Sequence, residues 1–256
     1  MSEVTPAVSW PRPYWQPGEE EAVLQFYVFG KFEPELLIPS PRYGSPGLPE
    51  GVEIQRFQNA VLRQWEGYPL NGALGQLIKE DTPAAYENAR IAPEVLVVRG
   101  VLKDADTLDY LRDTLGVLAG MLDVGGTAIL DPQILTLFDA DHWRRHYLVK
   151  DGAPPRNHVL ILRSGEEAAD RSWIHTRGMR KFGRPDLSLH NVPEGDIDRA
   201  GVLCERLVEL LSLGANFAAG QELEVDGLAE GLVARPGGSL DDPDFNNTHI
   251  AFHWPQ

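Results

Sequence analysis

The chain is 256 residues long, and its 23 Lys and Arg residues against 38 Asp and Glu residues give a formal net charge of −15 at pH 7. A chain of this length forms one large domain or two small ones and can bury a sizeable core. The 43% apolar and 24% charged composition is typical of a globular protein and argues against wholesale disorder. The acidic balance argues against general nucleic-acid binding, which needs a concentrated basic surface.

The N-terminal sequence gives no sign of a membrane or export signal. No apolar run approaches the roughly 20 residues that cross a bilayer as a helix. The Pro-rich first 18 residues lack the continuous apolar stretch of a signal peptide, so we expect a cytoplasmic protein with no membrane partner. The same prolines predict an extended arm from Met1 to Pro17. Its aromatic residues either lie on the surface of their own domain or dock a partner: Trp10, Tyr14 and Trp15.

The next elements are predicted from apolar runs and their spacing. Residues 22–29 form a compact apolar run that predicts a strand, and the prolines and glycines of residues 33–51 predict a loop. In residues 52–65, apolar side chains recur at helical spacing, which predicts a helix. Residues 83–89 predict a second short helix, because a proline is favourable in the first turn.

The strongest local pattern is a β-α-β unit in the middle of the chain. Residues 95–102 predict a buried strand. Asp104 or Asp106 is placed to cap the helix that follows, because a short carboxylate accepts hydrogen bonds from first-turn amides. One apolar stripe of that helix spans residues 108–122, and residues 127–130 predict the next strand.

The second half repeats this theme less regularly. Its helix is predicted to be capped by Asp196 or Asp198, and its strands are predicted at residues 158–162, 173–176, 187–189, 232–234 and 249–254. Helices among unevenly ordered strands predict an α+β fold with a mainly antiparallel sheet and two β-α-β-like halves. We divide the chain into an arm with an irregular α/β segment (1–92), a first half (93–150) and a second half (151–256), packed as one globular unit. Residues 151–156 are predicted to separate the halves or to turn the chain.

The clearest anomaly is the segment from Arg171 to Arg184, which holds five of the 23 basic residues and no acidic residue. Arginine presents a planar fork that binds phosphate or carboxylate groups. The predicted ligand-binding residues are therefore His175, Arg177, Arg180, Lys181 and Arg184. The alternative, which we favour, is that these cations pair with the protein's own carboxylates, because neighbouring residues on a strand point to opposite faces.

The sequence Trp173-Ile-His-Thr-Arg-Gly-Met-Arg-Lys-Phe-Gly-Arg-Pro-Asp186 resembles a segment of an uncharacterised bacterial protein family of unknown function. The context is similar too, with an upstream helix, the stretch Ala128-Ile-Leu-Asp-Pro-Gln133 and then Trp143. The resemblance covers about residues 95–254 and implies an α+β domain. It implies no catalytic residue.

Two histidine-containing patterns could suggest a metal site. His142 and His146 lie four residues apart, so they share one face of a helix, but zinc needs a third protein ligand. Trp143 stands where the metalloprotease pattern has a glutamate. The acidic run 241–244, near His249 and His253, lacks the spacing of a calcium loop. We therefore predict no metal and no cofactor.

The charge and the absence of catalytic motifs favour one class of function. Cys204 falls on an apolar helix stripe and is predicted to be core, and no nucleophile elbow, phosphate loop or kinase signature occurs. These observations favour a non-catalytic bacterial protein-binding protein, such as an immunity protein or an adaptor, that meets a basic partner through its acidic surface. The alternative is an enzyme or binding domain for an anionic ligand, in which His175 acts as acid or base beside Arg177, Arg180 and Arg184.

Overall fold

The computed structural model describes residues 8–18, 20–148, 155–228 and 230–255. The start of the predicted arm and most of the predicted turn at 151–156 lie outside the described residues. The chain divides into two compact units. The first comprises residues 1–11, 23–102 and 107–153, and the second comprises residues 12–22, 103–106 and 154–256.

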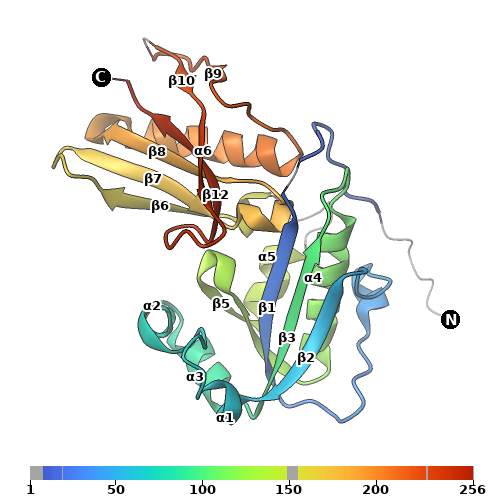
Figure 1. Ribbon diagram of the computed structural model, residues 1–256. Coiled ribbons are helices and arrows are strands. Elements are labelled where there is room, and N and C mark those ends of the chain that lie inside the picture. Colours follow the sequence, from blue (N-terminus) through green and yellow to red (C-terminus); the bar gives the residue numbers. More distant parts are fainter. Residues whose placement is uncertain (1–7, 19, 149–154, 229, 256) are drawn as a thin grey trace. The chain divides into compact units, whose positions relative to one another are not determined.

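The first unit is a five-stranded sheet with helices packed against it (Figure 1). The strands follow the order β2-β3-β1-β4-β5, with bounds β1 Ala22–Gly30, β2 Val52–Gln58, β3 Glu94–Leu102, β4 Gly126–Asp131 and β5 Thr136–Asp139. The helices are α1 Asn59–Leu62, α2 Gly72–Asp81, α3 Pro83–Ile91, α4 Asp109–Asp123 and α5 Ala140–Tyr147, with short 3-10 turns η1 Ser40–Tyr43 and η2 Pro132–Ile134. Tyr27 and Phe29 share a core with α1–α3, whereas Phe26 contacts Trp143 of α5. Both faces of β1 are therefore buried, as its apolar run requires.

One predicted element of this unit is wrong. Residues 52–58 form strand β2 and not the first half of a helix, and only Asn59–Leu62 is helical. β2 pairs with β3 along its whole length, from Val52 opposite Gly100 to Gln58 opposite Glu94. Main-chain hydrogen bonds to the buried strand β3 therefore determine the secondary structure of residues 52–58. The helical spacing of Ile54 and Phe57 does not determine it.

The predicted capping of α4 is also wrong. The helix begins at Asp109, and no side chain caps its first turn. Asp104 belongs to the second unit, where its carboxylate lies between two buried guanidinium groups. Its Oδ1 is 2.6 Å from Nη1 of Arg12, and its Oδ2 is 3.0 Å from Nη1 of Arg184. Trp15 also donates its indole N–H to Oδ2, at 2.9 Å, so this network fixes part of the predicted arm.

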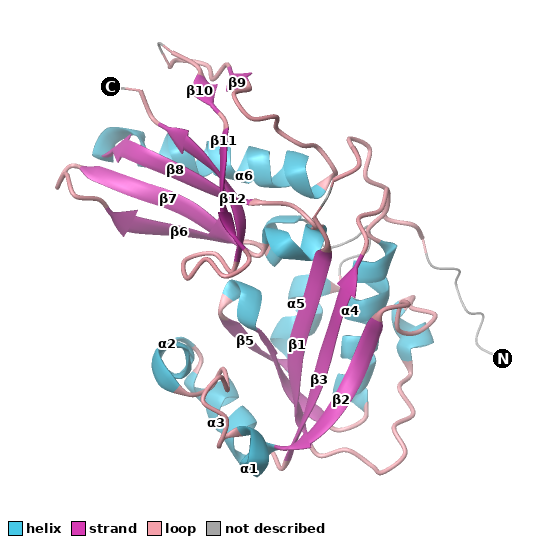
Figure 2. Cartoon of the chain, in the orientation of Figure 1, coloured by secondary structure: helices cyan, strands magenta, loops and turns pink. Residues whose placement is uncertain are grey.

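The second unit is a five-stranded sheet covered on one face by a long helix (Figure 2). The strands follow the order β11-β12-β8-β7-β6, with bounds β6 Leu160–Gly165, β7 Arg171–Arg177, β8 Asp186–Pro193, β11 Arg235–Ser239 and β12 Asn247–His253. The helix is α6 Ile197–Ser212; β9 Glu222–Leu223 and β10 Leu232–Val233 form a separate ribbon, and the 3-10 turns are η3 Pro155–His158, η4 Met179–Phe182 and η5 Glu194–Asp196. β8 and β12 are parallel neighbours and the other pairs are antiparallel, which confirms the α+β class.

The helix α6 supplies the core of this unit. It packs against β7 and β8, and its apolar stripe, Cys204 included, is buried. Burial raises the pKa of the Cys204 thiol to about 12, as expected for a core residue. No side chain caps the first turn of α6, so the predicted capping role of Asp196 or Asp198 is wrong. Within the described ranges, no helix is both long and apolar enough to span a bilayer.

Candidate functional site on the second sheet

The face of the second sheet opposite α6 carries polar and aromatic side chains. Successive residues of a strand point to opposite faces, so Leu187 and Leu189 lie on one face of β8, and Ser188 and His190 on the other. Leu187 and Leu189 are fully buried in the strand that α6 covers. In the sheet register, Ser188 lies opposite His175 of β7, and His190 lies beside His253 of β12. We call this second surface the histidine face.

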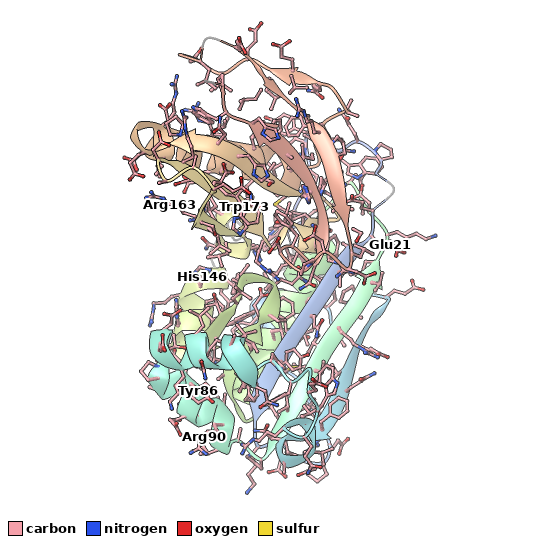
Figure 3. All side chains as sticks on the ribbon, turned by 60° about the vertical axis from the view of Figure 1, so that its left-hand side comes forward. Glu21, Tyr86, Arg90, His146, Arg163 and Trp173 are labelled. Atoms are coloured by element: carbon pink, nitrogen blue, oxygen red, sulfur yellow. The ribbon has the colours of Figure 1, made fainter. Side chains whose placement is uncertain are left out.

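Aromatic rings on the histidine face stack across three strands. The ring centroids of Trp173 and His175 lie 3.7 Å apart, with an interplanar angle of 17°. Trp173 is also parallel to His190 at 5.7 Å, and His190 is stacked on His253 at 5.2 Å. Figure 3 labels Trp173 on β7. The row Trp173–His190–His253 therefore presents a series of flat rings, from partly buried Trp173 to exposed His253.

The loop between β11 and β12, residues 240–246, covers part of this face. Phe245 is buried, and its ring meets Trp173 and His175 nearly edge-on, at 5.9 and 5.8 Å. Two arginines bind the main chain of the loop: Arg177 donates to the carbonyl of Asp244 at 2.5 Å, and Arg180 donates to that of Asn246 at 3.1 Å.

A continuous chain of hydrogen bonds passes through Ser188 and His190. Trp173 donates its indole N–H to Oγ of Ser188 at 2.8 Å, and this Oγ lies 2.9 Å from Nε2 of His190. Nδ1 of His190 lies 2.9 Å from Oε1 of Glu166, and the second carboxylate oxygen accepts the main-chain N–H of Asn191 at 3.0 Å. Glu166 follows β6 in the sequence, so the β6–β7 connection brings it to the end of β8.

Carboxylates lie at the rim of the histidine face. Besides Glu166, Asp242 is 3.8 Å from Nδ1 of His249, and Asp244 is close enough to raise the pKa of His175. Burial has the larger and opposite effect and lowers the pKa of His175 to about 4, with smaller contributions from Arg177 and His190. Burial also lowers the pKa values of His249 and His253.

The predicted ligand-binding residues separate into three directions. His175 stacks on the histidine face, and Arg177 and Arg180 bind the 240–246 loop. Lys181 is buried and donates to the carbonyl of His158. Arg184 is also buried; it pairs with Asp104 and donates to four main-chain carbonyls, those of Gln16, Gly183, Gly214 and Ala215. The structure thus does not bring the five side chains into one pocket, and binding of a ligand by them stays a prediction.

The other histidine pair lies in the first unit. His142 and His146 are on α5, with ring centroids 5.8 Å apart, and both contact the ring of Phe138. Over the parts of the chain that the structure describes, no group of three or more His, Cys, Asp or Glu side chains is placed to hold a metal ion.

Sequence reasoning missed Ser188, His190, Glu166 and Trp173 as a set. The signal available was the spacing Ser188-x-His190, which places both side chains on one face of a predicted strand. Nothing in the sequence connects Glu166 to them. Searches of protein-family models, curated proteins and solved structures found no match to this chain, so the site is interpreted from its own geometry.

Proposed function

We propose that this chain is a protein-binding protein and that its histidine face docks a basic segment of a partner. The observation that carries this proposal is the row of stacked rings Trp173–His190–His253 beside the carboxylates Glu166 and Asp244. Lysine and arginine bind aromatic faces through cation–π contacts and pair with carboxylates. The row and its rim therefore offer both kinds of contact to the same basic side chain.

The charge of the whole chain supports a basic partner. With a net charge of −15, the protein attracts a cationic surface from a distance and speeds encounter. Two of the five cations in residues 171–184, Lys181 and Arg184, are buried and do not face a partner. Arg235 is a cation near the row, where it lowers the pKa of His253, so we place the contact at the Trp173 and Glu166 end.

Basic peptides test this function directly. We expect an Arg-rich peptide to bind with an affinity that falls steeply between about 50 and 300 mM salt, because salt in this range screens exposed charges. Trp173→Ala combined with Asp244→Asn should weaken binding about tenfold or more, as expected for removal of an aromatic anchor and a charge. Isothermal titration against a peptide with Gln in place of every Arg measures the charge contribution.

The first unit provides a matched control. Trp65 has an exposed fraction of 53%, and its replacement by Ala removes an exposed indole far along the chain from the histidine face. Trp65→Ala should leave peptide binding unchanged. Equal losses in the Trp65 and Trp173 variants, or binding that ignores salt, would contradict docking at the histidine face.

An anionic ligand at Arg177 and Arg180 is the second candidate. One observation favours it: Nε of each arginine is buried, with no hydrogen-bond partner among the described residues. A phosphate or carboxylate group would supply that acceptor. Binding of inorganic phosphate should then shift the Nε–H resonances of both arginines in NMR spectra. Unchanged resonances at about 10 mM phosphate, a concentration far above that of the protein, would exclude this candidate.

A further inference from the structure

We propose that Ser188 is a nucleophile for acyl transfer, with His190 as its general base and Glu166 as the residue that positions the imidazole. The inference goes beyond docking of a partner and does not depend on it. It rests on two contacts, 2.9 Å from Ser188 Oγ to His190 Nε2 and 2.9 Å from His190 Nδ1 to Glu166 Oε1. A nucleophile bonded to a base that a third group orients is the arrangement by which serine is activated.

The neighbouring groups fix the direction of each hydrogen bond. An indole N–H can only donate, so Oγ of Ser188 accepts from Trp173 and its own O–H is free to donate. A carboxylate can only accept, so Nδ1 of neutral His190 carries the proton and Nε2 accepts from Ser188. The serine proton therefore already points at the base, and Glu166 is itself held by the main-chain N–H of Asn191.

The reaction that this arrangement supports is ester hydrolysis in two steps. Oγ of Ser188 attacks the ester carbonyl carbon, a C–O bond forms, and the serine proton moves to Nε2 of His190. The C–O bond to the leaving alcohol breaks as His190 gives it that proton. Water then attacks the acyl-serine, passes one proton to His190, and releases a carboxylic acid as His190 returns the proton to Oγ of Ser188.

Two further groups of the histidine face complete the site. The Trp173 indole N–H holds Oγ of Ser188 in place, so that the serine O–H points at His190. His175 lies opposite Ser188 in the strand pair, and its Nδ1 is buried with no hydrogen-bond partner in the described part of the chain. In the tautomer that carries the proton on Nδ1, this ring atom can donate to a substrate oxygen. The aromatic surroundings, Trp173 and Phe245, fit an aryl ester.

Access to Ser188 depends on the loop 240–246, which packs on the neighbours of this serine. Ser188 is only 1% exposed, and Phe245 packs on the rings of Trp173 and His175, which flank it. The loop is held to the end of β7 and to η4 by the arginine bonds to the carbonyls of Asp244 and Asn246. Shortening the side chain of Phe245 should therefore admit a substrate without changing Ser188, His190 or Glu166.

A fluorophosphonate probe, with adducts located by mass spectrometry, tests the nucleophile. We expect one adduct, on Ser188, formed faster in Phe245→Ala than in the natural chain. His190→Gln should slow labelling about 100-fold or more, because general-base catalysis contributes that much. Ser188→Ala removes the adduct, and Ser239, an exposed serine of β11, is the internal control for unassisted reactivity.

Hydrolysis of 4-nitrophenyl acetate separates chemistry from packing. Glu166→Gln keeps the size of the side chain, so we expect kcat to fall about tenfold or more with KM unchanged and the same unfolding midpoint. Absence of a Ser188 adduct in both the natural chain and folded Phe245→Ala would overturn the proposal. So would labelling of Ser188 at the same rate in folded His190→Gln. Neither result affects the peptide-binding test, so failure of the two proposals is distinguishable.

Discussion

Two buried titratable groups of the second unit, His175 and Asp186, have opposite effects on stability between pH 4 and 6.5. Burial lowers the pKa of His175 from 6.5 to about 4. Between these pH values the histidine is protonated in the unfolded chain and neutral in the folded protein. Stability from this group therefore rises with pH. Burial raises the pKa of Asp186 from 3.8 to about 7, although Asn247, Thr176 and the N–H of Met179 donate to its carboxylate. In this range the carboxyl is protonated in the folded protein and ionised in the unfolded chain. The contribution of Asp186 to the free energy of unfolding therefore falls as the pH rises.

The two contributions are of similar size. Each spans about 2.5 pH units of the window, and one unit corresponds to about 1.4 kcal/mol, so each changes the free energy of unfolding by about 3 kcal/mol. In the natural chain they largely cancel. Asp186→Asn leaves only the histidine effect, so its unfolding free energy should rise by about 3 kcal/mol, relative to the natural chain, from pH 4 to 6.5. His175→Phe keeps a ring for stacking on Trp173 and should show the opposite change.

Urea unfolding at several pH values and constant ionic strength measures these slopes. All other groups titrate alike in the proteins compared, so the difference in slope from the natural chain isolates each residue, whatever the variant costs in absolute stability. The double variant should regain the slope of the natural chain. Single variants whose profiles run parallel to that of the natural chain would refute the assignment of a buried neutral histidine and a buried protonated aspartate.

Two further substitutions test the packing of the arm on the second unit. Asp104→Asn leaves two buried guanidinium groups without a counter-charge and should lower the free energy of unfolding by about 3 kcal/mol or more; Glu87→Gln, in a half-exposed ion pair, should change it by less than about 0.5 kcal/mol, and equal effects would contradict the argument. Gly214 has a φ of 103°, and a Cβ there would lie 2.4 Å from Cα of Trp15. Gly214→Ala should therefore cost about 2 kcal/mol in urea unfolding, whereas an unchanged unfolding midpoint would show that the arm does not pack there.

Local patterns predicted the elements whose burial is determined by their own sequence. The run 22–29 is β1, and the stripe 108–122 is α4, because each buries its apolar residues with little competition. The helix predicted over residues 52–65 is wrong for residues 52–58, because the spacing of a few apolar residues fits a helix as well as a strand. The strand conformation is fixed by β3, which follows α1–α3 in the chain and supplies the hydrogen bonds.

Only part of the histidine face can be predicted from the sequence. The basic neighbours of His175 in the sequence indicate a ligand site, yet its structural partners are Trp173 and Phe245. Alternation along β8 places Ser188 beside His190, but Glu166 reaches them through a connection whose geometry no local pattern gives. The partners of the basic segment are likewise distant, and most are main-chain carbonyls, which carry no sequence signature.

The loop 240–246 connects the two proposals. It carries Asp244, which we place in the contact with a basic partner, and Phe245, whose ring packs on His175, the residue opposite Ser188. A cation that draws the Asp244 carboxylate outward also pulls on the main-chain carbonyl that Arg177 binds, because both groups belong to the same residue. We therefore expect an Arg-rich peptide to speed fluorophosphonate labelling of Ser188 in the natural chain and to have no effect in Phe245→Ala, where the cover is already gone. Equal acceleration in both proteins would show that the peptide acts elsewhere, because a single covering side chain cannot be displaced after it has been removed.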